Sequence, residues 1–281
     1  MKKLTVGMAT YDDFDGVYFT IQAIRLYHPE ALDEIEFLVV DNNPNEESGQ
    51  AVKAYLEKSV PNGRYLPFTE YKSNFVKDLV FTQAQTEYVL CVDCHVLLPP
   101  GVLKKLLEYY SLFPNTKDLL QGPLMHDDGI NFSTHFDPGW SSHMFGQWGF
   151  AKELFEAGAP FEVPMQGGGL FSCKKEHWVG FNPKFRGFGG EEWYLQEKFR
   201  LSGGRAICLP FLQWMHRFGR PLGPKFPLNM YDRIRNYYVG WMELYQDKHH
   251  TGIQQMLEYF IQEGHEETVN KVLADLEKEN K

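Results

Sequence analysis

The chain has 281 residues, of which 43% are hydrophobic and 23% are charged, and its formal net charge is −9. This composition is typical of a globular protein and excludes collagen-like, disulfide-scaffold and low-complexity classes. The acidic balance argues against a protein that grips duplex DNA by counterion release, because such proteins are normally basic. The longest apolar runs are far shorter than the roughly 20 residues of a membrane-spanning helix, and the N-terminus lacks the pattern of a signal peptide.

Apolar runs alternate with segments of helical periodicity through the first half of the chain. This pattern predicts strands at 4–9, 36–42, 65–68, 87–93 and 118–124. It predicts helices at 17–28, 48–58, 75–85 and 100–113. Strand–helix alternation of this kind indicates a mostly parallel sheet with helices on both faces. Because ligands of such sheets bind at the carboxyl ends of the strands, the residues that follow the strands are the candidates for function.

The second half of the chain is less regular. The segment 125–165 is rich in Trp, His, Gly and Phe but has no clear period, so we expect a long irregular segment. Within it, we expect residues 135–150 to form a mobile lid whose aromatic side chains stack on an acceptor. The alternative is that these aromatic side chains only form a small hydrophobic core under a long loop. Further elements are predicted as a short strand in 165–178, a glycine loop and helix in 185–206, a strand over 207–216, and helices at 230–246, 252–263 and 266–279. We therefore expect a domain at 1–228 and a helical appendage at 229–281.

The run YVLCVDCHVLLPP carries a carboxylate and an imidazole, Asp93 and His95, at the end of a predicted strand. Strand alternation puts both side chains on one face, where they can hold a divalent ion and leave positions for phosphate oxygens. The alternative is a solvated Asp beside a capping His. Cys91 and Cys94 have CxxC spacing but no partner pair, so we expect buried thiols in a reducing, cytoplasmic compartment.

Neither a Walker loop nor GxGxxG follows the first strand, which weighs against P-loop NTPases and dinucleotide dehydrogenases. The residues after that strand are instead Thr10 and Tyr11. Asp41 ends the second strand, where its carboxylate can accept a hydrogen bond from a base or ribose. Equally, an Asp at this point can cap the following turn.

Two later motifs carry charge that a ligand can use. Glu191 and Glu192 follow the glycines of GFGG and begin a helix. The helix dipole favours carboxylates at this end of a helix, so the two residues need no further function there. The alternative is that they bind an acceptor or that one of them acts as a general base. His216 ends QWMH; a lone His is commonly structural, but Arg217 and Arg220 beside it favour an anion-binding role.

Together these motifs resemble the GT-A glycosyltransferases over roughly residues 4–228. The Asp93-x-His95 form of the metal motif and the block GGGLFSCKKEHWVGFNPKFRGFGGEE are similar to the polypeptide N-acetylgalactosaminyltransferases. The FGGEE loop also resembles the Skp1-type N-acetylglucosaminyltransferases. The resemblance implies an α/β GT-A fold, a mixed sheet flanked by helices, and metal-dependent transfer from a nucleotide-diphosphate sugar, expected to be a UDP-sugar, with retention. The compact chain, in which we recognise neither the lectin domain nor the anchor of the Golgi enzymes, is similar to bacterial or phage-encoded members.

The resemblance also implies roles for individual residues. Asp93, His95 and His216 would bind a divalent cation, manganese or else magnesium. Glu191 and Glu192 would be the catalytic carboxylates that hold sugar or acceptor hydroxyls. The donor would contact a third group of residues, namely Thr10, Tyr11, Asp41, Gly168 and Gly169. Arg217 joins this group because its positive charge can bind the diphosphate. GGEE departs from the acid–Asn pair of those enzymes, and the acceptor stays open among a glycan, a protein and a modified DNA base.

Two other functions share parts of this pattern. A metal-dependent nucleotidyltransferase would bind a nucleoside triphosphate, but no basic triphosphate loop lies near Thr10. A non-catalytic sugar-binding protein would use the aromatic stretch 136–150 as a platform, but it would not need a metal triad to clamp a diphosphate. Release of UDP from a panel of nucleotide sugars with manganese would separate the three.

Overall fold

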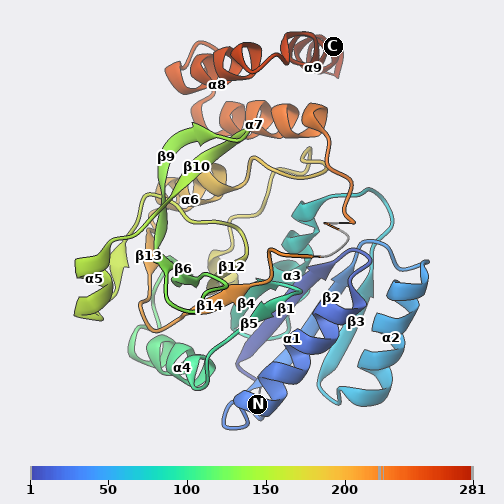
Figure 1. Ribbon diagram of the computed structural model, residues 1–281, viewed down its shortest axis with the longest axis vertical. Coiled ribbons are helices and arrows are strands. Elements are labelled where there is room, and N and C mark those ends of the chain that lie inside the picture. The colour runs from blue at the N-terminus through green and yellow to red at the C-terminus, as the bar shows by residue number, and fades with distance from the viewer. Residues whose placement is uncertain (1, 221–222, 224, 280–281) are drawn as a thin grey trace.

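The first four long strands form the parallel half of the central sheet (Figure 1). In sheet order they are β4 (Tyr88–Asp93), β1 (Leu4–Thr10), β2 (Ile35–Asp41) and β3 (Gly63–Pro67). The register pairs Thr10 with Asp41 and Ala9 with Asp93, so the carboxyl ends of the strands meet at one edge. The computed structural model describes residues 2–220, 223 and 225–279.

Helices cover both faces of this sheet, which is why its inner strands are almost continuously apolar. One face packs against α1 (Phe14–Tyr27), α2 (Glu47–Ser59) and α4 (Val102–Leu112). The other face packs against α3 (Asp78–Gln83), which follows the short 3-10 helix η1 (Asn74–Lys77), and against α6 (Glu192–Leu201). Neighbouring strand residues alternate between the two cores: Val39 lies in the first and Val40 in the second.

The sheet is mixed, as expected, because an antiparallel strand interrupts it. That strand is β12 (Leu170–Lys174), which lies between β4 and β6 (Leu119–Gln121) and is followed by the short 3-10 helix η2 (Lys175–His177). Beyond β6 the sheet ends with β13 (Ala206–Cys208) and β11 (Phe161–Glu162). The eight strands therefore run in the order β11-β13-β6-β12-β4-β1-β2-β3.

The prediction of one strand over 207–216 is wrong. The chain leaves the central sheet after β13, turns at 209–212 and enters a second sheet as β14 (Trp214–His216). Pro210 in the turn has no N–H group to continue the ladder. The second sheet also contains β5 (Val96–Leu97), β7 (Leu124–Met125) and β8 (Phe132–Ser133). Its register pairs His216 with Val96, which brings His216 beside the segment that follows β4.

The expectation of an irregular segment at 125–165 is also wrong. Much of it is an antiparallel hairpin of β9 (His135–Ser141) and β10 (Met144–Gly149), followed by α5 (Lys152–Ala157). Both turn residues, Ser142 and His143, have positive φ, as the two-residue hairpin turn of type I′ requires. Ser-His is not the Asn-Gly or Asp-Gly pair that announces such a turn in a sequence, so periodicity alone did not reveal it.

Three helices close the chain at one end of the molecule, beside the hairpin (Figure 1). They are α7 (Met230–Tyr245), α8 (Thr251–Gln262) and α9 (Glu266–Glu279). Their aromatic core takes in Trp140 and Phe145 of the hairpin and Tyr194 of α6. The domain division at residue 228 stays a prediction, and residues 221, 222 and 224 of the loop that was expected to mark it lie outside the described residues. Among the described helices, none has the length and apolar character needed to cross a membrane.

Candidate active site

A cavity of about 410 Å³ lies at the carboxyl ends of β1 and β4, the edge to which the strand pattern pointed. Thr10 ends β1 and Asp93 ends β4, while His216 of β14 and Glu191, directly before α6, form other parts of the wall. This volume lies within the range of small-molecule and cofactor sites. We refer to this space as the donor cavity, after the role expected for it from the sequence.

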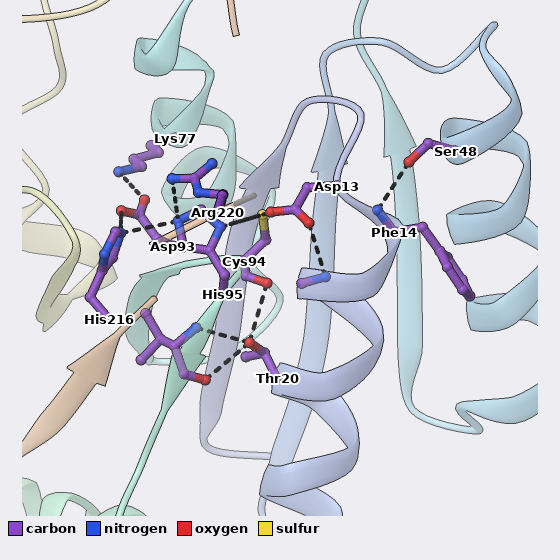
Figure 2. Close-up of polar contacts among 12 residues, drawn as sticks. Asp13, Phe14, Thr20, Ser48, Lys77, Asp93, Cys94, His95, His216 and Arg220 are labelled. Carbon is purple, nitrogen blue, oxygen red and sulfur yellow. Dashed lines mark hydrogen bonds and ion pairs between the residues drawn. The ribbon is translucent and has the colours of Figure 1, made fainter. Parts of the chain in front are cut away.

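Asp93, His95 and His216 point toward one another in the wall of this cavity, as Figure 2 shows. The two imidazole Nε2 atoms are 3.0 Å apart, and Nε2 of His216 is 3.3 Å from a carboxylate oxygen of Asp93. One ligand atom from each residue lies within 4.8 Å of the others. Two imidazole nitrogens with one carboxylate oxygen are a donor set that divalent transition metals accept. The three residues predicted as metal ligands are therefore brought together, although 121 positions separate the two histidines.

Asp13 lies behind His95, and sequence reasoning missed it (Figure 2). Its Oδ2 is 2.9 Å from Nδ1 of His95, while its Oδ1 accepts a hydrogen bond from the backbone N–H of Gly16 and caps α1. Burial raises the pKa of Asp13, but the contacts with His95 outweigh this effect and lower the pKa to about 2. A carboxylate at Nδ1 fixes the imidazole tautomer and leaves Nε2 free to accept a metal.

Lys77 is a second residue that sequence reasoning missed. Its buried Nζ lies 2.7 Å from Oδ1 of Asp93 and donates to the carbonyl oxygen of Gly168 at 2.8 Å. Burial alone would lower the pKa of Lys77, but the facing Asp93 carboxylate raises it above its usual value. In return, Lys77 lowers the pKa of Asp93 against the opposing effect of burial. The available signal was a lysine, followed by an aspartate, between the apolar residues of FVKDLVF.

Glu191 and Glu192 are both buried in the wall of the donor cavity, with 4% and 6% exposure. Oε1 of Glu191 accepts a hydrogen bond from Asn74 at 2.8 Å, but neither Oε2 atom has a hydrogen-bond partner among the described residues. Burial raises the pKa of both carboxyl groups. The charge of Glu191 raises the pKa of Glu192 further, whereas Lys77 opposes the increase at Glu191. Buried oxygens without partners are unfavourable unless a ligand satisfies them.

Four of the predicted donor-contacting residues line the donor cavity: Thr10, Tyr11, Gly168 and Gly169. The Tyr11 ring lies edge-on to Phe226, with 5.1 Å between the ring centroids. Gly169 passes so close to Trp214 that a Cβ atom would lie 2.6 Å from the indole ring. The chain therefore needs glycine at position 169.

Asp41 does not line the donor cavity. Its buried carboxylate accepts hydrogen bonds from the backbone N–H of Asn43 and the hydroxyl of Tyr65, each at 2.8 Å. The residue that lines the cavity at this strand end is Asn42. The structure thus favours the interpretation in which Asp41 caps the loop after β2, and it does not support the predicted contact with a donor.

Arg217 does not line the donor cavity either, and its contact with a donor stays a prediction. Its side chain is exposed, because successive residues point in opposite directions and His216 points inward. Of the two neighbouring arginines, it is Arg220 that lines the cavity, and its Nη2 is 3.2 Å from Nε2 of His95. Cys91 and Cys94 are free and buried, as predicted, and so are Cys173 and Cys208.

Comparison with known proteins decides the family. The sequence model of glycosyl transferase family 2 matches residues 5–145, which is half of the chain. The chain belongs to glycosyl transferase family 2. A relative from Drosophila melanogaster that is named as a polypeptide N-acetylgalactosaminyltransferase is 28% identical over 160 residues, covering 51% of this chain and 27% of the relative.

Solved structures share the fold of this family 2 chain. GalNAc-T7, solved with UDP, GalNAc and Mn²⁺, superimposes with a TM-score of 0.69 at 14% identity, over 88% of this chain and 49% of its own. S. aureus TarS 1-349, solved with UDP-GlcNAc, gives a TM-score of 0.57 at 15% identity, over 92% of this chain and 71% of its own. The GT-A fold prediction is confirmed. The chain spans about a quarter of the length of the curated relative and about half that of GalNAc-T7.

Family membership also settles the class of protein. The chain is an enzyme of the glycosyltransferase class. The match to a glycosyltransferase family favours this class over the nucleotidyltransferase and over the non-catalytic sugar-binding protein.

Proposed function

We propose that this glycosyltransferase moves a sugar from a UDP-sugar to an acceptor hydroxyl, with a divalent cation on Asp93, His95 and His216. The observation that carries the proposal is the convergence of one carboxylate and two imidazoles in the wall of the donor cavity. The structures of GalNAc-T7 with UDP and TarS with UDP-GlcNAc support the donor class.

Manganese is the expected cation. The GalNAc-T7 structure contains it, and two imidazole ligands disfavour magnesium, which prefers oxygen ligands. A cation bound here would neutralise the charge that develops on the diphosphate as the sugar leaves.

Residues of the chain itself prepare the site for this reaction. Lys77 keeps Asp93 ionised, which is the state in which a carboxylate binds a cation. Asp13 orients His95 through Nδ1. Arg220 brings a second permanent positive charge to the same wall, where it would attract the diphosphate. These charges are fixed before the donor binds, so little reorganisation is needed during the reaction.

We infer that the reaction retains anomeric configuration. Inversion needs a carboxylate base for the acceptor hydroxyl, and Glu192 is the residue placed for that role. Burial and the adjacent Glu191 raise the pKa of Glu192 well above its usual value, so both disfavour the carboxylate form that a general base needs. Front-side attack, in which the leaving phosphate oxygen takes the proton, needs no such base.

Release of UDP from UDP-Glc, UDP-GlcNAc, UDP-Gal and UDP-GalNAc in the presence of MnCl₂ would test the proposal. We expect release from at least one donor, loss of release with EDTA, and loss in His95→Ala and His216→Ala. Calorimetric titration with MnCl₂ should show that each variant binds the metal at least 10–100-fold more weakly. His249→Ala, an exposed histidine far along the chain, is the control. Release that survives both EDTA and the His95 substitution would overturn the metal assignment.

A further inference from the structure

A second cavity of about 430 Å³ adjoins the donor cavity on the side of the β9–β10 hairpin. Four residues line both spaces and form a shared wall: Phe136, Met144, Trp148 and Glu192. The remaining lining of the second space comes from the hairpin itself: Ser141, Ser142, Phe145, Gly146 and Gln147. We call this second space the hairpin groove.

We propose that the hairpin groove is the acceptor subsite and that it binds a neutral pyranoside. This inference rests on the proposed function, because an acceptor subsite requires a donor in the adjoining cavity. The indole of Trp148 would lie against a sugar ring, and Gln147 and the serine hydroxyls would hydrogen-bond its hydroxyl groups. The reacting hydroxyl would reach the donor across the shared wall beside Glu192.

The position of the groove supports the assignment. Glu192 lines both spaces, and its Oε2 is buried without a partner among the described residues. An unpaired carboxyl oxygen between a donor cavity and an open groove can satisfy its hydrogen-bonding capacity with a hydroxyl from either side. In the transfer itself, the acceptor oxygen forms a bond to the anomeric carbon as the bond from that carbon to the diphosphate breaks, and the hydroxyl proton passes to the released phosphate oxygen.

The chemistry of the lining selects a neutral ligand. Neither Lys nor Arg occurs among the described residues that line the groove, and its one titratable side chain is the acidic Glu192. A nucleic acid or another polyphosphate needs cations along its path, and here it would meet the carboxyl group of Glu192 instead.

The aromatic part of the lining is flat and accessible. Trp148 keeps 43% of its surface exposed, and Phe136 holds it edge-on with the ring centroids 4.2 Å apart. Such a ring offers apolar surface to the C–H face of a sugar, while Gln147 beside it supplies both a donor and an acceptor group. A flat apolar face edged by amide and hydroxyl groups is what a polyhydroxylated ring needs.

The C-terminal helices hold this surface in place. The backbone N–H of Phe145 donates to the Tyr237 hydroxyl of α7 at 2.8 Å, and that of His143 donates to the Tyr259 hydroxyl of α8 at 3.0 Å. Trp140 stacks on Tyr259 with 4.8 Å between centroids. These contacts favour a fixed platform over the mobile lid expected from the sequence. Because the groove is already formed before an acceptor binds, binding does not have to order the hairpin at a cost in free energy.

Kinetics with neutral and charged acceptors would test the inference. The assay would use the donor that gives UDP release, with lactose, maltose and chitobiose as neutral acceptors and a ten-residue oligothymidylate as the polyanion. For Trp148→Ala we expect the acceptor KM to rise about 10-fold, the worth of one good aromatic contact. The donor KM should change less than the acceptor KM. Gln147→Ala should raise the acceptor KM by a smaller factor. Phe150→Ala is the matched control, since Phe150 is 44% exposed, close to Trp148, but does not line the groove.

Several outcomes would overturn the assignment. The first is an acceptor KM that is equal in the Trp148 and Phe150 variants, and the second is a preference of the enzyme for the oligothymidylate. The third is that no sugar is transferred to the neutral acceptors and that these acceptors also give no saturation-transfer NMR signal in the presence of UDP and MnCl₂. If circular dichroism shows that Trp148→Ala is unfolded, the Gln147 variant decides the question by the same comparison. Absence of UDP release with every donor would instead mean that the proposed function fails.

Discussion

The pairing of Lys77 with Asp93 makes a prediction about stability that can be worked out from the structure. Lys77→Met keeps most of the aliphatic stem but removes the charge that lies 2.7 Å from the Asp93 carboxylate and the hydrogen bond to the Gly168 carbonyl. Removing one partner of a buried ion pair leaves an uncompensated charge, which costs about 3–5 kcal/mol. We therefore expect the free energy of unfolding at pH 7, without metal, to fall by that amount.

Urea denaturation followed by tryptophan fluorescence would measure the effect. The control is Lys104→Met, which removes an exposed lysine 4.0 Å from Glu108 and should change stability by less than about 0.5 kcal/mol. MnCl₂ should recover part of the loss in Lys77→Met, because a bound cation compensates Asp93. Asp93 has a lowered pKa, so ionised Asp93 stabilises the fold above its unfolded pKa and this contribution disappears as the pH falls. The difference between wild type and Lys77→Met should accordingly shrink below about pH 4. A loss no larger than that of the control would refute this reasoning.

Three further predictions concern other carboxyl groups. Asp13→Asn should lower stability by roughly 2 kcal/mol at pH 7, and urea denaturation should show this difference shrinking as the pH falls from 3.8 toward the folded pKa of about 2. A difference that does not depend on pH would mean that only the helix cap matters. Glu192→Gln should leave turnover within a few-fold of wild type, whereas Glu191→Gln should lower it by roughly 10²-fold or more. NMR of the product should show a retained anomeric configuration, and an inverted product together with an inactive Glu192→Gln would contradict the assignment. Asp41→Asn should lower the free energy of unfolding by about 1 kcal/mol and leave the Kd for UDP unchanged in calorimetry; a weakened Kd would return Asp41 to the donor site.

Local sequence patterns were sufficient for most elements of the fold. The parallel strands and their helices were expected from apolar runs and periodicity, and the structure has them with ends shifted by a few residues. The elements that failed depend on contacts distant in the sequence. The segments 118–124 and 207–216, each predicted as one strand, both divide between two sheets. The Ser142–His143 turn forms with the hairpin tip bonded to α7 and α8. Neither cause is visible within a short window of sequence.

Strand ends and residue spacing by themselves determined at which edge of the sheet the donor cavity lies and that Asp93 and His95 share one face, whereas the family resemblance added His216 as the third ligand. This succeeds because the carboxyl ends of parallel strands must share an edge, whatever the rest of the chain does. Only the tertiary structure decided which charges complete the site: Lys77 and Arg220 face the cavity, while Asp41 and Arg217 do not. A side chain's partner depends on the packing of elements far apart in the chain. The pairing of Lys77 with Asp93 and the placing of His216 beside His95 therefore exist only once the two sheets have formed.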